Sequence, residues 1–242
     1  MSAGVVVRAA EVARCVAGPG ASLRLLVETG NGAPGLVRRL ADLAPGGRME
    51  GRSAAADELW FVLGGAGELE AGGQPPVPLH PDRGVLIPAG MAFAVSAAAA
   101  TGLRLDMVAL PVAPGAAGPP PAGTGPAISD FADCEIETTR DRQFRVVFGP
   151  GRGCPAATSF VGEIPPGRAP AHSHPYDEVV LILQGEGIAH IGGAEHPLSA
   201  GTCAHLPPGL VHCLENTGPS MMRVLGVFHP ADSPAAKLEE HG

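Results

Sequence analysis

The chain of 242 residues is poor in residue types that several common kinds of site require. It has one lysine, Lys237, among 16 basic residues, which excludes a Walker-type phosphate loop and an internal Schiff-base lysine. The 24 acidic residues outnumber the basic ones, for a net charge of −8, and no window carries a basic stripe. The composition therefore argues against nucleic acid as a partner.

Cysteines and long apolar runs are also scarce. The five cysteines are odd in number and show no CxxC spacing. This argues against a structural zinc site or a disulfide framework and favours a reducing compartment. Nowhere do about 18 uncharged apolar residues run together, and Arg8, Glu11 and Arg14 interrupt the N-terminal stretch, unlike a signal peptide. We therefore expect a soluble, cytoplasmic protein with no membrane partner.

Turn-forming residues, by contrast, are abundant. There are 35 Gly and 26 Pro, about a quarter of the chain, which approaches a disordered composition. The 45% hydrophobic content can nevertheless bury enough apolar surface to offset the ordering entropy. The turn formers are therefore expected to separate many short strands, which predicts an all-β fold.

A Pro/Ala/Gly-rich stretch, residues 112–127, divides the chain. It has no periodicity, so we interpret it as a linker between a domain of residues 1–111 and a domain of residues 128–242. Eight of the nine histidines follow the linker.

The two halves contain an internal repeat. The segment from Glu58, ELWFVLGGAGELEAGG, aligns with the segment from Glu178, EVVLILQGEGIAHIGG. Each copy is typical of a strand, a glycine hairpin and a second strand, so each half is expected to form a β-sandwich or barrel. The loss of histidine from one copy indicates duplication followed by loss of chemistry.

A cluster of potential metal ligands lies in the second half. His172 and His174 are two residues apart and Glu178 has the same parity, so an extended chain turns all three to one face. His212 follows a Pro-x-Gly turn. Three imidazoles and one carboxylate are a donor set that suits a divalent transition metal.

These segments resemble the two sequence motifs of the cupin superfamily. The first motif is matched, with its first gap one residue short, by Gly167, His172, His174, Glu178 and Gly185. The second motif is matched without departure by Gly201, Pro207, Gly209, His212 and Asn216. The resemblance implies two tandem jelly-roll β-barrels, a bicupin, in which His172, His174, Glu178 and His212 hold the metal.

The first barrel is a degenerate copy under this alignment. Arg52, Ala54 and Phe93 stand opposite the three histidines, and only Glu58 survives at a ligand position. One carboxylate cannot hold a metal, so we expect residues 1–111 to form a metal-free barrel. Its expected role is structural: closing a sheet edge, covering the other barrel or forming a dimer.

The ligand set predicts one divalent ion, chosen among Fe, Mn, Ni, Cu, Co and Zn, with Fe or Mn favoured. The resemblance to germin- and quercetinase-like cupins implies an oxygen-dependent dioxygenase acting on a small, metal-chelating organic substrate. Two alternatives stay open: redox-neutral Lewis-acid chemistry (an isomerase, lyase or hydrolase), and a non-catalytic small-molecule-binding cupin. The expected partners are a small-molecule substrate, with dioxygen and a second copy of the chain in a homodimer as optional ones.

Three further residues are candidates for catalysis. His190 and His205 lie on predicted strands of the second barrel and are acid–base candidates if they face inward. Tyr176, between two predicted ligands, is expected at the mouth of the site or in the core. Val180, Ile182 and Leu206 are candidates for an apolar site wall, which would suit a moderately hydrophobic substrate.

Overall fold

The chain folds almost entirely into β-strands. A computed structural model describes residues 4–30, 35–52, 55–111, 123–139, 142–235 and 239–240. Three single-turn helices accompany the strands: η1 (Ala9–Glu11), η2 (Phe131–Asp133) and η3 (Pro150–Arg152). Over these described ranges, helices are too short to span a membrane. The predicted all-β class is confirmed.

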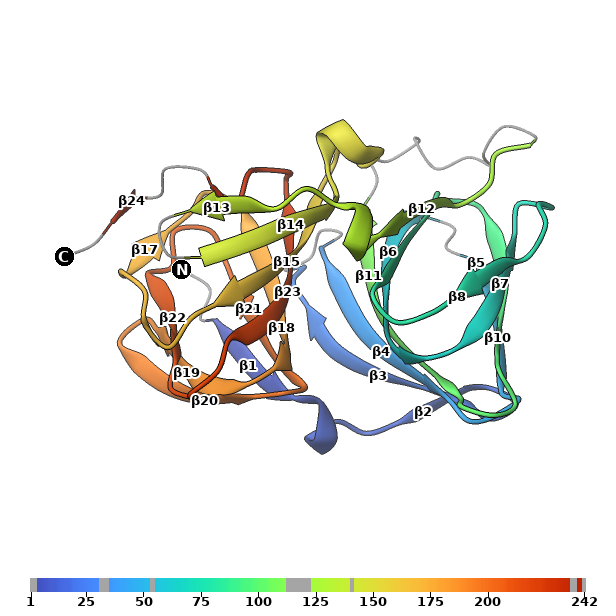
Figure 1. The fold of residues 1–242 in the computed structure, drawn as a ribbon, viewed down its shortest axis with the longest axis horizontal. Coiled ribbons are helices and arrows are strands. Elements are labelled where there is room, and N and C mark those ends of the chain that lie inside the picture. Colours follow the sequence, from blue (N-terminus) through green and yellow to red (C-terminus); the bar gives the residue numbers. More distant parts are fainter. Residues whose placement is uncertain are drawn as a thin grey trace. The chain divides into compact units, whose positions relative to one another are not determined.

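The strands form two compact units, each with two antiparallel sheets (Figure 1). The N-terminal unit comprises residues 12–133. The C-terminal unit comprises residues 134–242 together with the first eleven residues.

The N-terminal unit contains β2 (Cys15–Gly18), β3 (Ala21–Glu28), β4 (Val37–Leu43), β5 (Arg48–Arg52), β6 (Ala56–Gly65), β7 (Gly67–Ala71), β8 (Val77–Leu79), β9 (Arg83–Ile87), β10 (Ala92–Ala97), β11 (Leu103–Pro111) and β12 (Ala127–Asp130). One sheet has the order β12-β9-β6-β11-β4-β3-β2 and the other the order β5-β10-β7-β8. Their inner faces share a core of aliphatic side chains, methionines and Trp60.

The C-terminal unit contains β1 (Val5–Arg8), β13 (Glu137–Thr139), β14 (Arg142–Phe148), β15 (Thr158–Ile164), β16 (Gly167–Arg168), β17 (His172–Ser173), β18 (Asp177–Gln184), β19 (Glu186–Ile191), β20 (Ala194–Ser199), β21 (Thr202–Leu206), β22 (His212–Asn216), β23 (Met222–His229) and β24 (Glu239–Glu240). One sheet has the order β1-β21-β18-β23-β15-β14-β13. The other has the order β20-β19-β22-β17-β24, and β16 pairs with β22.

The internal repeat is visible in the pairing of the strands. β6 lies between β9 and β11, and β18 lies between β21 and β23. Each of these central strands ends in a glycine, or is followed by one, with positive φ: Gly65 at 79° and Gly185 at 93°. Because L-residues with a side chain rarely adopt this conformation, the glycine pattern marks the same tight turn in both copies. The two jelly-roll barrels implied by the sequence are what the sheets show.

The boundaries of the units differ from those predicted. β1 lies in the predicted first domain but pairs with β21 of the C-terminal unit, in the register Val5↔His205. β12 starts at Ala127, the end of the predicted linker, and pairs with β9 of the N-terminal unit. Each segment covers a strand that would otherwise be a sheet edge, and an open edge exposes unpaired backbone groups. Residues 112–122 of the predicted linker lie outside the described residues.

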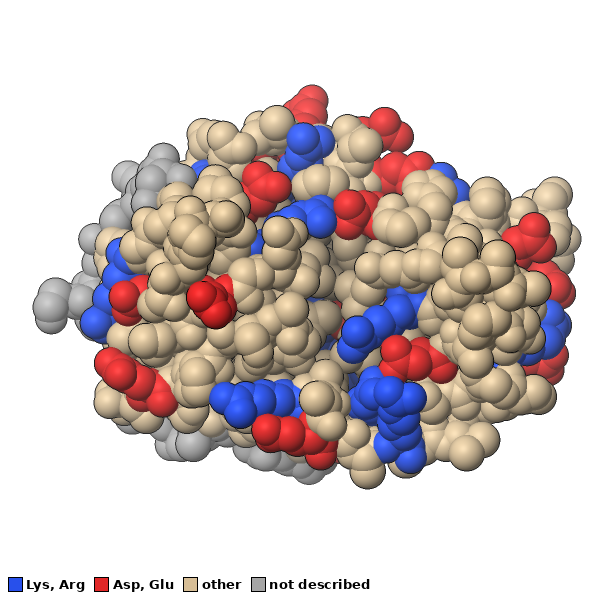
Figure 2. Space-filling model, turned by 60° about the horizontal axis from the view of Figure 1, so that its bottom comes forward, with Lys and Arg blue, Asp and Glu red and all other residues tan. Residues whose placement is uncertain are grey.

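Charge is dispersed on the face drawn in Figure 2. Acidic and basic side chains are interspersed there on a surface that is mostly uncharged. The sequence likewise contains no long run of acidic or of basic residues.

Candidate metal centre

The predicted ligands converge in the C-terminal unit from three strands and one loop. His172 lies on β17, directly opposite His212 at the start of β22. His174 lies in the loop that follows β17, and Glu178 lies at the start of β18. Glu178 is opposite Leu206, so its side chain shares the inner face of the sheet with Val180 and the other core residues.

A single turn fastens the two histidine segments together. The Leu210 N–H donates to the Pro207 carbonyl over 3.2 Å, and Gly209 between them has a φ of 74°. A turn with positive φ at its third position requires glycine there, which explains the Pro-x-Gly spacing. The Gly209 N–H in turn donates to the carbonyl of His174 over 2.8 Å. The turn that leads to one ligand therefore holds the backbone of another.

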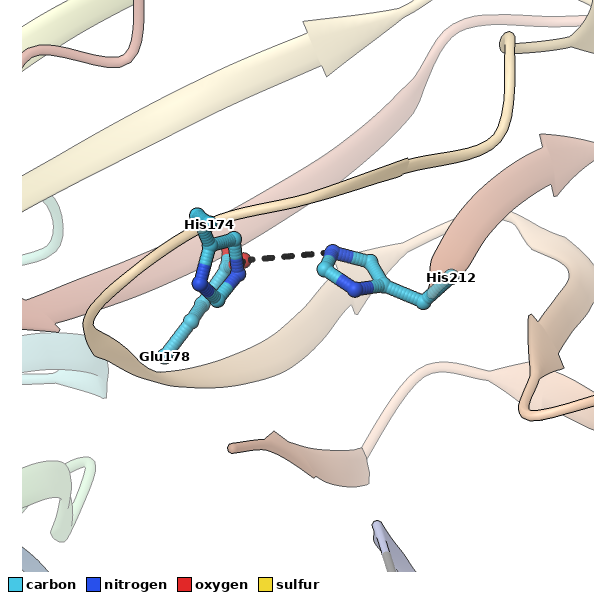
Figure 3. A group of neighbouring side chains, drawn as sticks. All are labelled: His174, Glu178 and His212. Carbon is cyan, nitrogen blue, oxygen red and sulfur yellow. Dashed lines mark hydrogen bonds and ion pairs between the residues drawn. The ribbon is translucent and has the colours of Figure 1, made fainter. Parts of the chain in front are cut away.

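Three of the four predicted ligands form a tight group (Figure 3). Glu178 Oε2 is 3.1 Å from His174 Nε2 and 3.8 Å from His212 Nε2. The ligand atoms of these three residues all lie within 4.8 Å of one another. His172 lies beside this group, with its ring centroid 4.5 Å from that of His212 and 6.4 Å from that of His174.

Backbone carbonyls fix the orientation of all three imidazoles. Nδ1 lies 3.1 Å from the Pro170 oxygen in His172, 2.7 Å from the Tyr176 oxygen in His174 and 2.8 Å from the Leu210 oxygen in His212. Because a carbonyl oxygen only accepts, Nδ1 is the protonated nitrogen in each ring. In His172 and His212 the other nitrogen, Nε2, keeps its lone pair for a metal or a proton. In His174, Nε2 donates to Glu178 when the ring is protonated and offers its lone pair when the ring is neutral.

The electrostatics of the group favour one anion beside mostly neutral imidazoles. Burial lowers the pKa of His172, and it lowers the pKa of His212 to about 4. Burial also acts to lower the pKa of His174, but the hydrogen bond and charge of Glu178 outweigh it and the pKa is raised. Burial acts to raise the pKa of Glu178, but the histidines outweigh it, so the pKa of this carboxyl is lowered.

The two distances from Glu178 fit a divalent ion, whereas the group as a whole is bounded at 4.8 Å. Imidazole nitrogen and carboxylate oxygen bind such ions at about 2.1 Å, so two donors of one ion lie at most about 4.2 Å apart. Both distances from Glu178, 3.1 and 3.8 Å, satisfy that limit. Nitrogen and oxygen donors together suit Zn, Fe, Mn, Co, Ni and Cu.

The group forms part of the wall of a cavity of about 510 Å³, a size that accommodates an organic ligand. Of the predicted apolar wall, Val180 and Leu206 line this cavity, whereas Ile182 packs in the core behind it. A few polar side chains also line it: Thr139, Arg142, Gln143 and Glu163.

The three catalytic candidates take different positions. Tyr176 lines the cavity and stacks on His174, with ring centroids 4.2 Å apart and planes within 4°. Burial raises its pKa. His190 and His205 do not line the cavity, so they do not meet the condition, an inward orientation, on which their candidacy depended.

Strand parity accounts for both exceptions. Leu206 and Glu178 face the cavity, so the adjacent His205 faces the other side of β21, where its Nε2 lies 2.7 Å from Asp177 Oδ1. On β19, the neighbours of His190 pack into the core, so His190 faces away from it. Its Nε2 lies 2.7 Å from Glu215 Oε2.

Sequence reasoning missed the aromatic side of the cavity. Phe144, Phe160 and Phe228 line it from β14, β15 and β23. Each is one apolar residue on an ordinary strand, and only pairing of distant strands brings them together. The motif residue Asn216 has a structural role: its Nδ2 donates to the carbonyls of Ile164 and Ser220 over 2.8 and 2.7 Å.

The corresponding position in the N-terminal barrel is filled by other side chains. Phe93 packs edge-on against Trp60, with centroids 4.8 Å apart. Glu58 Oε2 accepts a hydrogen bond of 2.7 Å from the Trp60 indole, and Glu58 Oε1 accepts one of 3.0 Å from Arg39. Arg52 instead donates to the Gly90 carbonyl at the surface, and Ala54 lies outside the described residues.

Comparison with known proteins finds a family match within the second barrel. Residues 160–228 match the family described as the cupin domain. No curated protein matches the chain.

Solved structures resemble the whole chain. A Pseudomonas aeruginosa protein described as glyoxylate-induced is 15% identical at a TM-score of 0.79, covering 98% of this chain and 92% of that one. Protein Ylba from E. coli is 11% identical at a TM-score of 0.77, and the match covers 96% of this chain and 93% of that one. A mutant of Bacillus subtilis oxalate decarboxylase is 13% identical at a TM-score of 0.75, and the match covers 96% of this chain and 79% of that one. Mn(II) centres are described for that enzyme. At these identities the likeness concerns the fold.

Proposed function

Because residues 160–228 match the cupin domain and the chain folds into two β-barrels, we propose that the protein is a metal-dependent cupin enzyme. Its proposed substrate is a small organic molecule that chelates the ion, and its proposed reaction is an oxygen-dependent dioxygenation. The observation that carries the proposal is the group of His174, Glu178 and His212 in the wall of a largely apolar cavity.

Four residues would hold the ion: His172, His174, Glu178 and His212. The ion would supply either electron transfer to dioxygen or Lewis-acid polarisation of substrate oxygens. The carbonyls that accept from Nδ1 hold each ring in place and increase its basicity. Glu178 stays ionised because its pKa is lowered, so it contributes a negative charge to the donor set.

The remaining residues of the wall shape what enters. Val180 and Leu206 place apolar surface next to the ligand group, which excludes water from the reacting atoms. Tyr176 holds His174 from two sides, through its carbonyl and through its stacked ring. We assign Tyr176 a positioning role toward this ligand.

Metal analysis of the protein purified without added metal is the first test. We expect about one equivalent of a divalent transition metal in the wild type and in His196→Ala, a control histidine on β20 that does not line the cavity. The variant Glu178→Gln removes the anionic donor and should lose most of the ion. Retention of full metal content by Glu178→Gln would contradict the proposed site.

Oxygen consumption on a panel of chelating substrates then separates the reaction classes. Uptake that depends on both metal and substrate supports the dioxygenase. Metal-dependent turnover under nitrogen would instead indicate redox-neutral isomerase, lyase or hydrolase chemistry. Tight binding without turnover under either gas would indicate a binding protein.

A further inference from the structure

Four aromatic rings form a continuous row along one side of the cavity. We call Tyr176, Phe228, Phe160 and Phe144 the aromatic row. Successive ring centroids are 4.6, 4.8 and 6.4 Å apart, within the range of favourable aromatic contact. The row begins at the ligand group, because Tyr176 stacks on His174 at 4.2 Å.

The row concentrates a rare residue class in one place. The chain has one Trp, one Tyr and seven Phe, and four of these residues form the row. The rest of the apolar wall is aliphatic, with Ile164, Val180, Leu206, Leu214 and Val224. The cavity therefore has a polarisable aromatic side that leads away from the ligand group.

Two glycines make room for the row and for a ligand beside it. Phe160 is the cross-strand partner of Gly226, and a Cβ at Gly226 would lie 2.3 Å from the Phe160 ring. The ring therefore lies across the bare backbone of β23. Gly162 lines the cavity next to Phe160, and a Cβ there would meet Val224 at 3.2 Å. Side chains at these positions would displace the ring or narrow the cavity.

Resting on the function proposed above, we propose that the substrate is a planar conjugated ring with two adjacent oxygen atoms, of the catechol or enediol type. Its ring lies along the aromatic row, and its oxygens point to His174, Glu178 and His212. Rings favour offset or edge contact with other rings, which aliphatic chelators cannot make. A two-carbon dicarboxylate would leave most of the 510 Å³ empty.

Equilibrium binding to the zinc-loaded protein tests the proposed substrate class. Zinc is chosen because it is redox-inert, so that no oxygen chemistry consumes the probe during the measurement. The probes are 4-nitrocatechol, followed by its absorbance, and oxalate, followed by calorimetry. We expect 4-nitrocatechol to bind at least about tenfold more tightly than oxalate. The variant Phe160→Leu should weaken 4-nitrocatechol about fivefold and change oxalate less than about twofold.

Phe148→Leu is the matched control, since Phe148 is buried in the same unit but does not line the cavity. It should leave both affinities unchanged. Phe144→Leu, at the far end of the row, provides the same test if Phe160→Leu does not fold.

The outcomes separate this inference from the function on which it rests. Two results would overturn the aromatic substrate while leaving the proposed metal enzyme intact, provided that the protein retains zinc. The first is that oxalate binds as tightly as 4-nitrocatechol, and the second is that Phe160→Leu changes neither affinity. Failure of the wild type to retain zinc overturns both the aromatic substrate and the metal enzyme.

Discussion

Replacement of Glu58 by alanine tests whether the N-terminal barrel has exchanged a metal site for a structural one. Glu58 occupies the only ligand position that this barrel retains, yet both of its carboxylate oxygens are engaged. One accepts from the Trp60 indole over 2.7 Å and the other from Arg39 over 3.0 Å. We expect Glu58→Ala to leave the metal content unchanged at about one equivalent and to destabilise the N-terminal unit.

The size of the loss follows from the burial of the two donors. Trp60 is 2% exposed, so its N–H cannot turn to water, and an unsatisfied buried donor costs about 1–3 kcal/mol. The Arg39 side chain is 26% exposed and remains partly hydrated, so the loss of its partner adds about 1 kcal/mol. The total is about 2–4 kcal/mol for Glu58→Ala. Glu58→Gln keeps an oxygen acceptor and should cost about 1 kcal/mol.

Urea unfolding followed by tryptophan fluorescence measures this directly, because Trp60 is the only tryptophan of the chain and lies in the N-terminal unit. Metal content is measured on the same preparations. The reasoning would be refuted if the wild type held two equivalents of metal and Glu58→Ala held only one. An unchanged unfolding midpoint would show that the two hydrogen bonds contribute nothing.

Three further predictions concern the ligands and a buried ion pair. His212→Ala should lose the ion, to less than about a tenth of an equivalent, while its circular dichroism stays that of the wild type, since packing rather than metal holds the barrel. Metal binding needs neutral imidazoles, and His174, whose pKa is raised, is the first of the three to take up a proton as the pH falls, because burial lowers the pKa of His172 and lowers that of His212 to about 4. The affinity should therefore be highest at alkaline pH and fall about tenfold per unit just below the pKa of His174, as chelator competition would measure; a hundredfold fall per unit in that first step would contradict this. Asp106→Ala removes both carboxylate oxygens that bind the fully buried Arg38, at 2.8 and 3.0 Å. It should lower the free energy of unfolding by about 3–5 kcal/mol, as urea unfolding would measure. Glu50→Ala, which removes the partner in an exposed ion pair with Arg48, is the control and should not shift the urea midpoint.

The parts of the fold that follow from the sequence are those encoded by local spacing. Alternation and turn glycines predict the strand–turn–strand copies, and Gly65 and Gly185 both have the positive φ that such turns demand. The Pro-x-Gly motif likewise predicts the turn before His212, because only glycine fits its third position. Local spacing also brings His174 and Glu178 together, 3.1 Å apart, whereas His212 joins them through the pairing of β22 with β17.

The parts that do not follow depend on which strands become neighbours. Val5–Arg8 has ordinary strand character, and nothing in four residues specifies β21 rather than a strand of the N-terminal barrel as its partner. The orientation of His205 depends on which face of β21 meets the core, and that face is set by the pairing of Leu206 with Glu178. A shift of one residue in register would reverse it.

The two barrels use the same local device for opposite purposes. In the N-terminal barrel, Phe93 lies across its cross-strand partner Gly51, where a Cβ would be 2.6 Å from the ring, and this ring packs on Trp60 at the position of the lost ligands. In the C-terminal barrel, Phe160 lies across Gly226 in the same way, but its ring borders a cavity instead of filling a ligand position. An aromatic ring over glycine therefore occurs in both barrels and does not by itself decide their function. What distinguishes the barrels is whether the carboxylate on the central strand faces imidazoles, as Glu178 does, or faces an arginine and an indole that neutralise and bind it.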